Sequence, residues 1–515
     1  MTGYRIGIDV GGTNTDAVIL DSSLKVVAAV KTPTTALSGQ GVASAIDSVL
    51  AASGVNPDQI SHAMLGTTHC MNAIVERRGL ARVGILRLGA PATTAVPPLE
   101  GWPEDLRRVI GEIAYVLPGG YEVDGRILTP LNEQAVRAAC HSMRGKIDAV
   151  AVIGVFSPID GRQEERVAEI VGEELGLPVS QSATIGTIGL LERENATILN
   201  AALMQTLRSM ADGFVAALTT RGIFAKPYFG QNDGTLMRLK YALKFPVLTI
   251  GCGPTNSIRG AAHLSGASDA LVIDIGGTTT DIGVLVRGFP RQSAHAAEIG
   301  GIRTNFRMPD VLSIGLGGGT IVRGDASAVK LGPDSVGYRL TDEALSFGGS
   351  TMTATDVALA VGVAQIDSTV RPSIEPALSA AAWTAIRELL EESIDRMKPS
   401  ADPILVILVG GGSIIAPQHL EGVAKLVRPQ HFGAANAVGA ALGEIAGQFE
   451  KIYQTARDRR ASRDDAASEA VRRAELAGAD PATVEVVALE ELPVPYMGGQ
   501  AVLIRARAVG KLATS

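Results

Sequence analysis

Two short segments, each acidic and rich in glycine, are the parts of this sequence best suited to chemistry. Residues 9–16 read DVGGTNTD and residues 274–281 read DIGGTTTD. Each follows an apolar run typical of a strand and leads into a second such run. A tight Gly-Gly turn leaves backbone N–H groups pointing outward, where they can bind phosphate oxygens. Two copies in matching contexts predict a duplicated domain with two facing phosphate loops.

The side chains of the two loops divide by chemistry. Asp9 and Asp274 precede the turns, where a carboxylate can hold Mg²⁺ directly or through its waters, so we predict both as metal-binding and catalytic residues. A metal and backbone amides would together neutralise the charge that develops when ATP transfers its phosphoryl group. Asp16 and Asp281 fit either a catalytic role or a local hydrogen bond at the start of a strand. The predicted nucleotide-binding residues are Gly11, Gly12, Thr13, Asn14, Thr15, Gly276, Gly277, Thr278 and Thr279.

Further glycine and small-residue segments indicate how the two halves meet. Gly410, Gly411 and Gly412 end an apolar strand in the second half, and we predict that they contact the nucleotide, although a plain loop has the same pattern. Residues 434–441 form a helix face of small residues suited to a close helix crossing. Residues 195–202 are its predicted counterpart from the first half, and the pair would make a hinge.

The remaining pattern alternates short strands with longer helices, which is typical of an α/β protein. We expect two duplicated α/β lobes around a nucleotide cleft, with a small C-terminal α/β appendage. The predicted domains are residues 1–184, 185–450 and 451–515. Residues 450–475 are predicted to be helical, followed by strands at 483–489 and 500–509 with a Pro- and Gly-rich loop between them. Earlier strands are expected at 5–10, 17–20, 25–31, 83–87, 149–155, 270–275, 282–286 and 404–408, and helices at 41–53, 68–78, 132–143, 163–175 and 195–219.

Composition narrows the class of protein. The chain has 515 residues, of which 46% are hydrophobic and 19% charged, as in globular proteins. A net charge of −7 without a basic run argues against nucleic acid as a partner. The three cysteines are far apart, which favours a reducing compartment. The longest apolar runs are of strand length and the first residues lack a signal pattern, so we expect a cytoplasmic protein that does not bind membranes.

Several motifs resemble those of the hydantoinase A/5-oxoprolinase family within the superfamily of acetate and sugar kinases, heat-shock chaperones and actin. Besides the two loops, the resemblance rests on GTT at 66–68, NA at 72–73 and ERRG at 76–79. It also rests on ER at 192–193, GP at 253–254, GLGGGT at 315–320 and GPDSVG at 332–337. It extends over about residues 4–445.

The resemblance implies that the duplicated lobes have the actin-like ATPase fold of the ribonuclease H-like type. It also implies an enzyme that uses ATP and Mg²⁺ to open a cyclic amide of the hydantoin, oxoproline or lactam type. It implies an oligomer, homomeric or heteromeric, in which a separate B-type subunit can carry out hydrolysis. Thr67 and Thr68 would lie on the acceptor side as catalytic residues. His69 fits either that side or a hydrogen-bonded packing role, and Gly317–Gly319 fits either a second substrate loop or a structural turn.

Three other functions stay open on the sequence. A small-molecule or sugar kinase would share both loops but would normally carry an aspartate base, and no segment identifies one. A subunit of an ATP-dependent ketone carboxylase belongs to the same resemblance. A non-catalytic ATP switch, like actin or a chaperone, would bind a protein partner through closure of its lobes.

Overall fold

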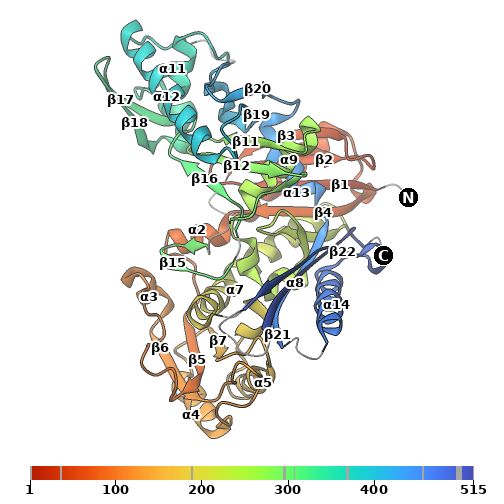
Figure 1. Cartoon of the computed structure of the whole chain (residues 1–515). Helices are drawn as coiled ribbons and strands as arrows, with labels where there is room; N and C mark the ends of the chain where they lie inside the picture. Colours follow the sequence, from red (N-terminus) through yellow and green to blue (C-terminus); the bar gives the residue numbers. More distant parts are fainter. Residues whose placement is uncertain are drawn as a thin grey trace.

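Three sheets stacked along the molecule carry most of the strands in a computed structural model of the chain (Figure 1). The model describes residues 3–34, 38–186, 189–293, 297–306, 308–366, 370–454, 458–494 and 501–513. Within these residues, the largest sheet has nine strands, the second six and the third four.

The nine-stranded sheet draws on three separate stretches of chain. Its order is β22-β23-β21-β10-β9-β4-β1-β2-β3 among the described residues. The strands are β1 (Tyr4–Val10), β2 (Asn14–Leu20), β3 (Val26–Pro33), β4 (Ile60–Thr67), β9 (Lys226–Gly230), β10 (Leu236–Arg238), β21 (Ile445–Gln454), β22 (Glu485–Pro493) and β23 (Ala501–Gly510). Strands from all three predicted domains, 1–184, 185–450 and 451–515, are hydrogen-bonded into this one sheet. The domain limits themselves stay a prediction.

The six-stranded sheet repeats the start of the larger one. β11 (Ala270–Ile275) and β12 (Thr280–Val286) form an antiparallel hairpin, and β19 (Ile404–Val409) lies parallel beside β11. In the same way β1 and β2 form an antiparallel hairpin with β4 parallel beside β1. The sheet is completed by β13 (Phe289–Pro290), β16 (Val311–Ile314) and β20 (Val423–Val427).

Helices separate and cover these two sheets in a repeated layer order. α1 (Ser38–Ser53) and α7 (Leu190–Thr219) cover one face of the larger sheet, and α13 (Ala435–Leu442) packs on β1, β2 and β4 at the other. α9 (Cys252–Ser265) crosses α13 and packs on the six-stranded sheet, whose far side is covered by α12 (Pro376–Met397). The chain therefore has the duplicated lobes that its internal repeat predicted, in the actin-like arrangement that the family resemblance implied.

The four-stranded sheet extends the first lobe away from these layers. Its parallel order is β6 (Ile113–Pro118), β5 (Val83–Ala90), β7 (Ala149–Gly154) and β8 (Val179–Gln181). Small hairpins are formed by β14 (Glu298–Ile299) with β15 (Ile302–Arg303) and by β17 (Thr320–Asp325) with β18 (Ala328–Ser335). The other helices are α2 (His69–Val75), α3 (Glu104–Ile110), α4 (Glu133–Met143), α5 (Arg162–Leu175), α6 (Ser182–Ile185), α8 (Leu239–Lys244), α10 (Leu340–Glu343), α11 (Ala354–Ala360) and α14 (Arg459–Ala477).

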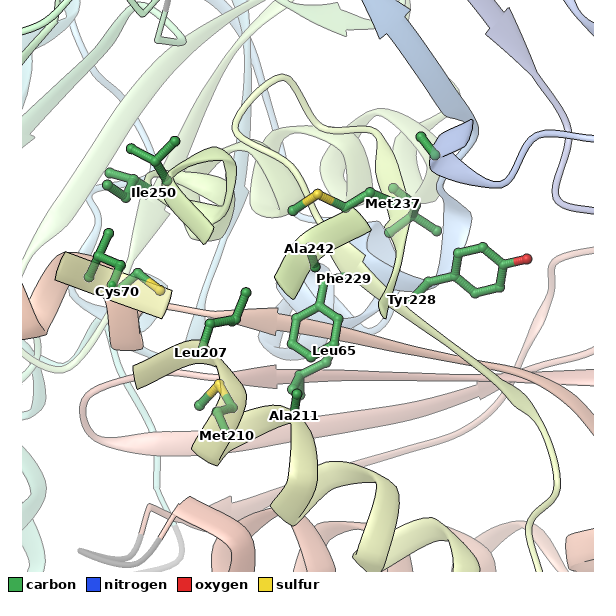
Figure 2. Packing of buried hydrophobic residues seen from close by; sticks show 14 of the residues in the cluster. Leu65, Cys70, Leu207, Met210, Ala211, Tyr228, Phe229, Met237, Ala242 and Ile250 are labelled. Carbon is green, nitrogen blue, oxygen red and sulfur yellow. The ribbon is translucent and has the colours of Figure 1, made fainter. Parts of the chain in front are cut away.

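The core of the first lobe joins strands to α7 (Figure 2). Leu65 of β4 and Phe229 of β9 lie against Leu207 and Ala211 of α7, and all four are fully or almost fully buried. Burial of such side chains contributes about 1.5–3 kcal/mol each for the larger ones. This packing holds β4 in place, and β4 pairs along its length with β1, which leads into the first glycine-rich turn.

Two predictions about elements are wrong. The helix that crosses α13 is α9, because residues 195–202 lie in α7, which packs against α1 and β7 instead. Residues 450–454 belong to β21, and the helix begins only at Arg459. Glu450 suits a strand because its carboxylate pairs with Arg505 on the neighbouring β23 at 2.5 Å. Most of the predicted loop between the last two strands lies outside the described residues.

Candidate nucleotide site between the two lobes

The two glycine-rich segments form hairpins of the same geometry. In the first hairpin Asp9 lies opposite Asp16, and in the second Asp274 lies opposite Asp281. In both turns the amide of the first glycine donates to the carbonyl three residues later, at 3.0 and 2.9 Å. The sequence repeat is therefore also a repeat of structure, down to the register of the four aspartates.

Consecutive residues of α9 bind the leading aspartates of both hairpins. The side-chain amide of Asn256 donates to Asp9 Oδ1 at 3.2 Å, and the hydroxyl of Ser257 donates to Asp274 Oδ2 at 2.5 Å. Because neighbouring residues of one helix contact both carboxylates, Asp9 and Asp274 lie close together although 265 positions separate them in the numbering. The structure thus brings together the two predicted metal-binding residues.

A second polar network ties the first hairpin to α13 and β3. Asn436 donates to Asp9 Oδ2 at 3.1 Å and to Asp16 Oδ2 at 2.9 Å. The other oxygen of Asp16 lies 2.5 Å from Nζ of Lys31, which faces Asp16 across the β2–β3 pair. Asp16 is therefore engaged in an ion pair and shares the Asn436 donor with Asp9, which agrees with the local hydrogen-bonding alternative. Whether Asp16 also takes part in catalysis stays a prediction.

The turns of the two hairpins face each other. A Cβ placed on Gly277 would lie 3.6 Å from the Thr13 side chain, so the second turn touches the first. Gly12, Thr278 and Thr279 are exposed at this junction. Thr15 is fully buried and its hydroxyl lies 3.2 Å from that of Thr34, so it packs behind the first turn. Asn14 and Gly11 are half-buried at the turn itself, and so is Gly276 in the second copy.

In each lobe, the strand that lies parallel to the first strand of the hairpin ends beside the leading aspartate. Gly66 is paired with Asp9, and Gly410 comes directly after Val409, which is paired with Asp274. A Cβ on Gly410 would lie 2.1 Å from Asp274 Oδ1, and its φ of 84° is in the range that favours glycine. Gly66 and Val409 therefore occupy equivalent places in the two lobes, and the residues after each of them continue beside the hairpins.

The members of the 410–412 loop differ in what they can contact. Gly412 is buried, and a Cβ there would lie 2.2 Å from the carbonyl oxygen of Gly276. The amide of Gly410 donates to the carbonyl of Phe432 at 2.9 Å. Gly411 is exposed toward the junction. Its position makes Gly411 the member of this loop that is open to a ligand, and nucleotide binding by all three stays a prediction.

The GLGGGT segment supports the second hairpin from behind. The amides of Gly318 and Gly319 donate to the carbonyls of Gly276 and Gly277 at 3.0 and 2.7 Å. All three glycines from 317 to 319 are buried. The sequence allowed either a second substrate loop or a structural turn at Gly317–Gly319. The structure favours the turn, because the amides of Gly318 and Gly319 already donate hydrogen bonds within the protein.

Thr67 and Thr68 lie at the end of β4 beside the first hairpin. The Thr67 hydroxyl accepts the amide of His69 at 3.1 Å, and its carbonyl accepts the thiol of Cys252 at 3.3 Å. Thr68 is half-buried, and its hydroxyl donates to the carbonyl of Val10 at 3.3 Å. His69 is also half-buried, and burial lowers its pKa from the ordinary value. Their proximity to the hairpin agrees with the predicted acceptor side, and their roles stay a prediction.

Burial governs the ionisation of the aspartates. Removal from water, together with the charges of Asp16 and Asp274, raises the pKa of Asp9 to about 7, although the hydrogen bonds from Asn256 and Asn436 lower it. Burial likewise raises the pKa of Asp274, opposed by Ser257 and Lys31. The pKa of Asp281 is raised to about 6, mainly by burial. Carboxylates that are costly to ionise in the protein alone gain most from a bound cation.

The donor set suits Mg²⁺ bound together with a phosphate ligand. Within the described residues, no three His, Cys, Asp or Glu side chains gather in a way that could hold a metal alone. Asp9 supplies a buried carboxylate and Asp274 a half-buried one, and Mg²⁺ is commonly held by one or two carboxylates plus waters and phosphate oxygens. The residues therefore fit the predicted metal, whose binding is a proposal below.

Sequence reasoning missed four polar residues of the site. They are Lys31, Asn256, Ser257 and Asn436. Weak signals existed, since Asn436 is the polar member of the small-residue helix and Asn256 follows the GP motif at 253–254. No local pattern could have assigned their partners, because each contact depends on the way α9, α13 and β3 dock.

Fold and site together define an α/β protein with two actin-like lobes whose glycine-rich hairpins meet at a shared acidic cluster. The chain belongs to the hydantoinase/oxoprolinase family. The model of the hydantoinase/oxoprolinase N-terminal region matches residues 5–175, and the hydantoinase/oxoprolinase model matches residues 193–369. The two matches together include most of the residues that build both hairpins.

Relatives differ in the reactions that their names describe. The chain is 26% identical to the caprolactamase subunit alpha of Pseudomonas jessenii over 87% of this chain and 67% of the relative. It is 27% identical to the acetophenone carboxylase gamma subunit of Aromatoleum aromaticum over 76% of this chain and 57% of the relative. The chain thus spans between about half and two thirds of the length of these relatives.

Solved structures share the fold over nearly the whole chain. The ATP-dependent caprolactamase from Pseudomonas jessenii superposes with a TM-score of 0.77 at 20% identity, covering 99% of this chain and 88% of that one. Nucleotide-free acetone carboxylase superposes with a TM-score of 0.70 at 18% identity and the same coverage. In the described part of the chain, none of the helices combines the length and apolar character needed to cross a bilayer.

Proposed function

We propose that this chain is an ATP-dependent subunit that activates a cyclic amide for ring opening by phosphorylating its carbonyl oxygen. One observation supports the phosphoryl-transfer step: Asp9 and Asp274 accept hydrogen bonds from consecutive residues of α9 and so lie close together. The turns of the two hairpins that carry these aspartates have exposed residues that a phosphate could reach. The choice of a cyclic amide is supported by family membership and by the likeness to a caprolactamase subunit over 87% of the chain.

Amide chemistry explains why ATP is needed. Nitrogen donates electron density into the carbonyl, so water attacks a lactam slowly. In the proposed reaction the carbonyl oxygen attacks the γ-phosphorus, the bond to the bridging oxygen breaks, and ADP leaves. Water then adds to the activated carbon, and cleavage of the C–N bond releases the ring nitrogen as an amine and leaves an acyl phosphate. A second water molecule hydrolyses the acyl phosphate to the carboxylate and free phosphate. A B-type subunit is the proposed site of this second stage.

The residues of the chain have separate parts in the first stage. A bound Mg²⁺ would supply positive charge to the phosphate oxygens. Asp9 and Asp274 would hold that ion, with Asn256, Ser257 and Asn436 keeping the carboxylates in place. Turn amides and the hydroxyls of Thr13 and Thr278 would orient the phosphates, and Thr68 lies on the side proposed for the acceptor. Holding acceptor and phosphate at a fixed separation lowers the entropic part of the barrier.

A screen of ATP hydrolysis tests this proposal. The purified chain, alone and with its candidate B-type partner subunit, is incubated with MgATP and caprolactam, 5-oxoproline or hydantoin, and ADP, phosphate and ring-opened product are measured. We expect phosphate release that depends on one of these cyclic amides and matches the ring-opened product in amount. Absence of stimulation by every cyclic amide in every subunit combination would contradict the proposal.

A second candidate function is that of a ketone carboxylase subunit, which is favoured by the likeness to the acetophenone carboxylase gamma subunit. The same screen distinguishes this function from cyclic-amide activation. That function predicts ATP hydrolysis that requires a ketone and bicarbonate together. A stable phosphorylated product would point instead to a small-molecule kinase. Stimulation by a protein and by no small molecule would point to an ATP switch.

A further inference from the structure

Lys31 extends from β3 to the meeting point of the two lobes. It lies opposite Asp16 in the β2–β3 register, with its Nζ 2.5 Å from Asp16 Oδ1. Its side chain is 39% exposed, whereas that of Asp16 is 4% exposed. One side of the ammonium group is thus bound to a buried carboxylate, and the rest of the side chain remains accessible to a ligand.

The same side chain reaches the second lobe. A Cβ placed on Gly411 would lie 3.7 Å from Lys31 Cε, and Gly411 is the exposed member of the 410–412 loop. The contact between the Thr13 side chain and Gly277 lies at the same junction of hairpins. Lys31 therefore contacts elements of both lobes where their open loops face each other.

Lys31 places a positive charge at a junction to which both hairpins contribute carboxylates. Asp9, Asp16, Asp274 and Asp281 place four carboxylates on the two hairpins. Among the described residues, Lys31 is the cationic side chain that forms an ion pair with any of them. It also opposes the rise in the pKa of Asp274 that burial causes. A polyphosphate brought to this acidic junction needs compensating positive charge, and a metal ion on two carboxylates supplies only part of it.

We propose that Lys31 is a phosphate-binding residue of the nucleotide site, held ready by its ion pair with Asp16. An ammonium group has three N–H donors, so it can keep a hydrogen bond to Asp16 while it donates another to a phosphate oxygen. The contact with Gly411 places that donor where phosphates would pass between the lobes. This proposal rests on the proposed function for the existence of a nucleotide site, and it adds a residue that the paired-hairpin motif does not contain.

Binding measurements with a matched control test the proposal. MgATP and MgADP affinities are measured by calorimetry for the wild-type chain, Lys31→Met and Lys25→Met, a change of the same charge at an exposed position at the start of the same hairpin arm. We expect Lys31→Met to weaken MgATP binding by about tenfold or more, because charge-assisted hydrogen bonds have that strength. Lys25→Met should bind as the wild type does. Equal MgATP affinity in Lys31→Met and the wild type would overturn the proposal.

A double variant separates phosphate binding from simple neutralisation of Asp16. If Lys31 only balances the Asp16 charge, then Asp16→Asn in the Lys31→Met background should restore MgATP affinity. We expect the double variant to stay at least as weak as Lys31→Met, and restoration would overturn the proposal. If the wild type binds MgATP but no cyclic amide stimulates it, the cyclic-amide function fails while the comparison of variants still decides the role of Lys31.

Discussion

At the scale of single residues, the site depends on two carboxylates that are shielded from water before any ligand binds, Asp9 almost completely and Asp274 in part. Asp9 is 3% exposed and has two asparagine donors, and Asp274 has a serine donor. These neutral donors orient the carboxylates but do not cancel their charge. The protein alone therefore holds its acidic cluster under electrostatic repulsion, which a bound cation would relieve.

Removal of the negative charge of Asp9 or of Asp274 should lower activity without lowering the stability of the fold. We expect Asp9→Asn and Asp274→Asn each to lower ATP turnover by roughly 100-fold or more, as loss of a group that stabilises transition-state charge does. The nucleotide-free variants should unfold at the same temperature as the wild type or higher, because a buried repulsion is removed. Turnover assays with thermal unfolding measure both effects. Full turnover in Asp9→Asn would contradict its assignment as a metal-binding residue.

The pKa of Asp9 predicts opposite pH effects on the free and the metal-bound protein. Folding raises this pKa from 3.8 to about 7, so the stability that Asp9 contributes is present at low pH and is lost as pH rises through about 7. Mg²⁺ needs the ionised carboxylate, so the gain in unfolding temperature from MgATP should grow over the same pH range. Thermal unfolding with and without MgATP checks both trends. In Asp9→Asn both should flatten, and a gain independent of pH in the wild type would contradict the assignment.

At the scale of elements, the crossing of α9 and α13 positions the whole site. A Cβ on Gly439 of α13 would lie 1.8 Å from the carbonyl oxygen of Asn256, and one on Gly260 of α9 would lie 1.8 Å from that of Ala435. The two helices therefore touch backbone to backbone. Each supplies an asparagine to Asp9, so the distance between the helices fixes the geometry of that carboxylate.

A single methyl group at this crossing should damage both stability and binding. We expect Gly439→Ala to lower the free energy of unfolding by about 2–3 kcal/mol, because the added carbon forces the helices apart. It should also weaken MgATP binding, since Asn256 and Asn436 would move relative to Asp9. Denaturant unfolding and calorimetry measure the two effects.

Gly172→Ala in α5 is the matched control for that change. Gly172 is exposed, and a Cβ there would meet nothing within 4 Å. This variant should be neutral or stabilised by roughly 0.5–1 kcal/mol, because alanine favours helix over glycine. Equal behaviour of Gly439→Ala and Gly172→Ala would show that the α9–α13 contact is looser than the structure places it.

At the scale of the whole molecule, the last strands are part of the sheet that carries the first hairpin. β21 pairs with β10 and with β23, so the C-terminal region continues the nine-stranded sheet. Ile504 of β23 is fully buried and belongs to the same hydrophobic cluster as Ile6 and Ile8 of β1. Loss of packing at the C-terminal strands should therefore lower the stability of the whole first lobe.

A core truncation in β23 tests this continuity. We expect Ile504→Ala to lower the free energy of unfolding by about 2–4 kcal/mol. Amide exchange should accelerate in β21 and in the strands next to it, as well as in β23. Val487→Ala on β22, where the side chain is 55% exposed, should change stability by no more than about 0.5 kcal/mol. Faster exchange confined to β22 and β23 would mean that these strands form an independent unit.

The sequence by itself determined the two hairpins, most strands and helices and the identity of the leading aspartates. These features depend on local sequence patterns, namely a Gly-Gly turn and the alternation of apolar residues along a strand, and on a short repeat whose two copies align without insertions. The register of Asp9 with Asp16 and of Asp274 with Asp281 follows from the length of the turn alone.

Only the tertiary structure decided which residues complete the site. Asn256 and Asn436 reach Asp9 across 247 and 427 positions of the chain, and Lys31 of the first lobe lies beside Gly411 of the second. Such contacts arise when sheets and helices dock, and docking is set by the summed packing of surfaces that no local pattern encodes. For the same reason α9, and not the residues at 195–202, proved to be the partner of α13.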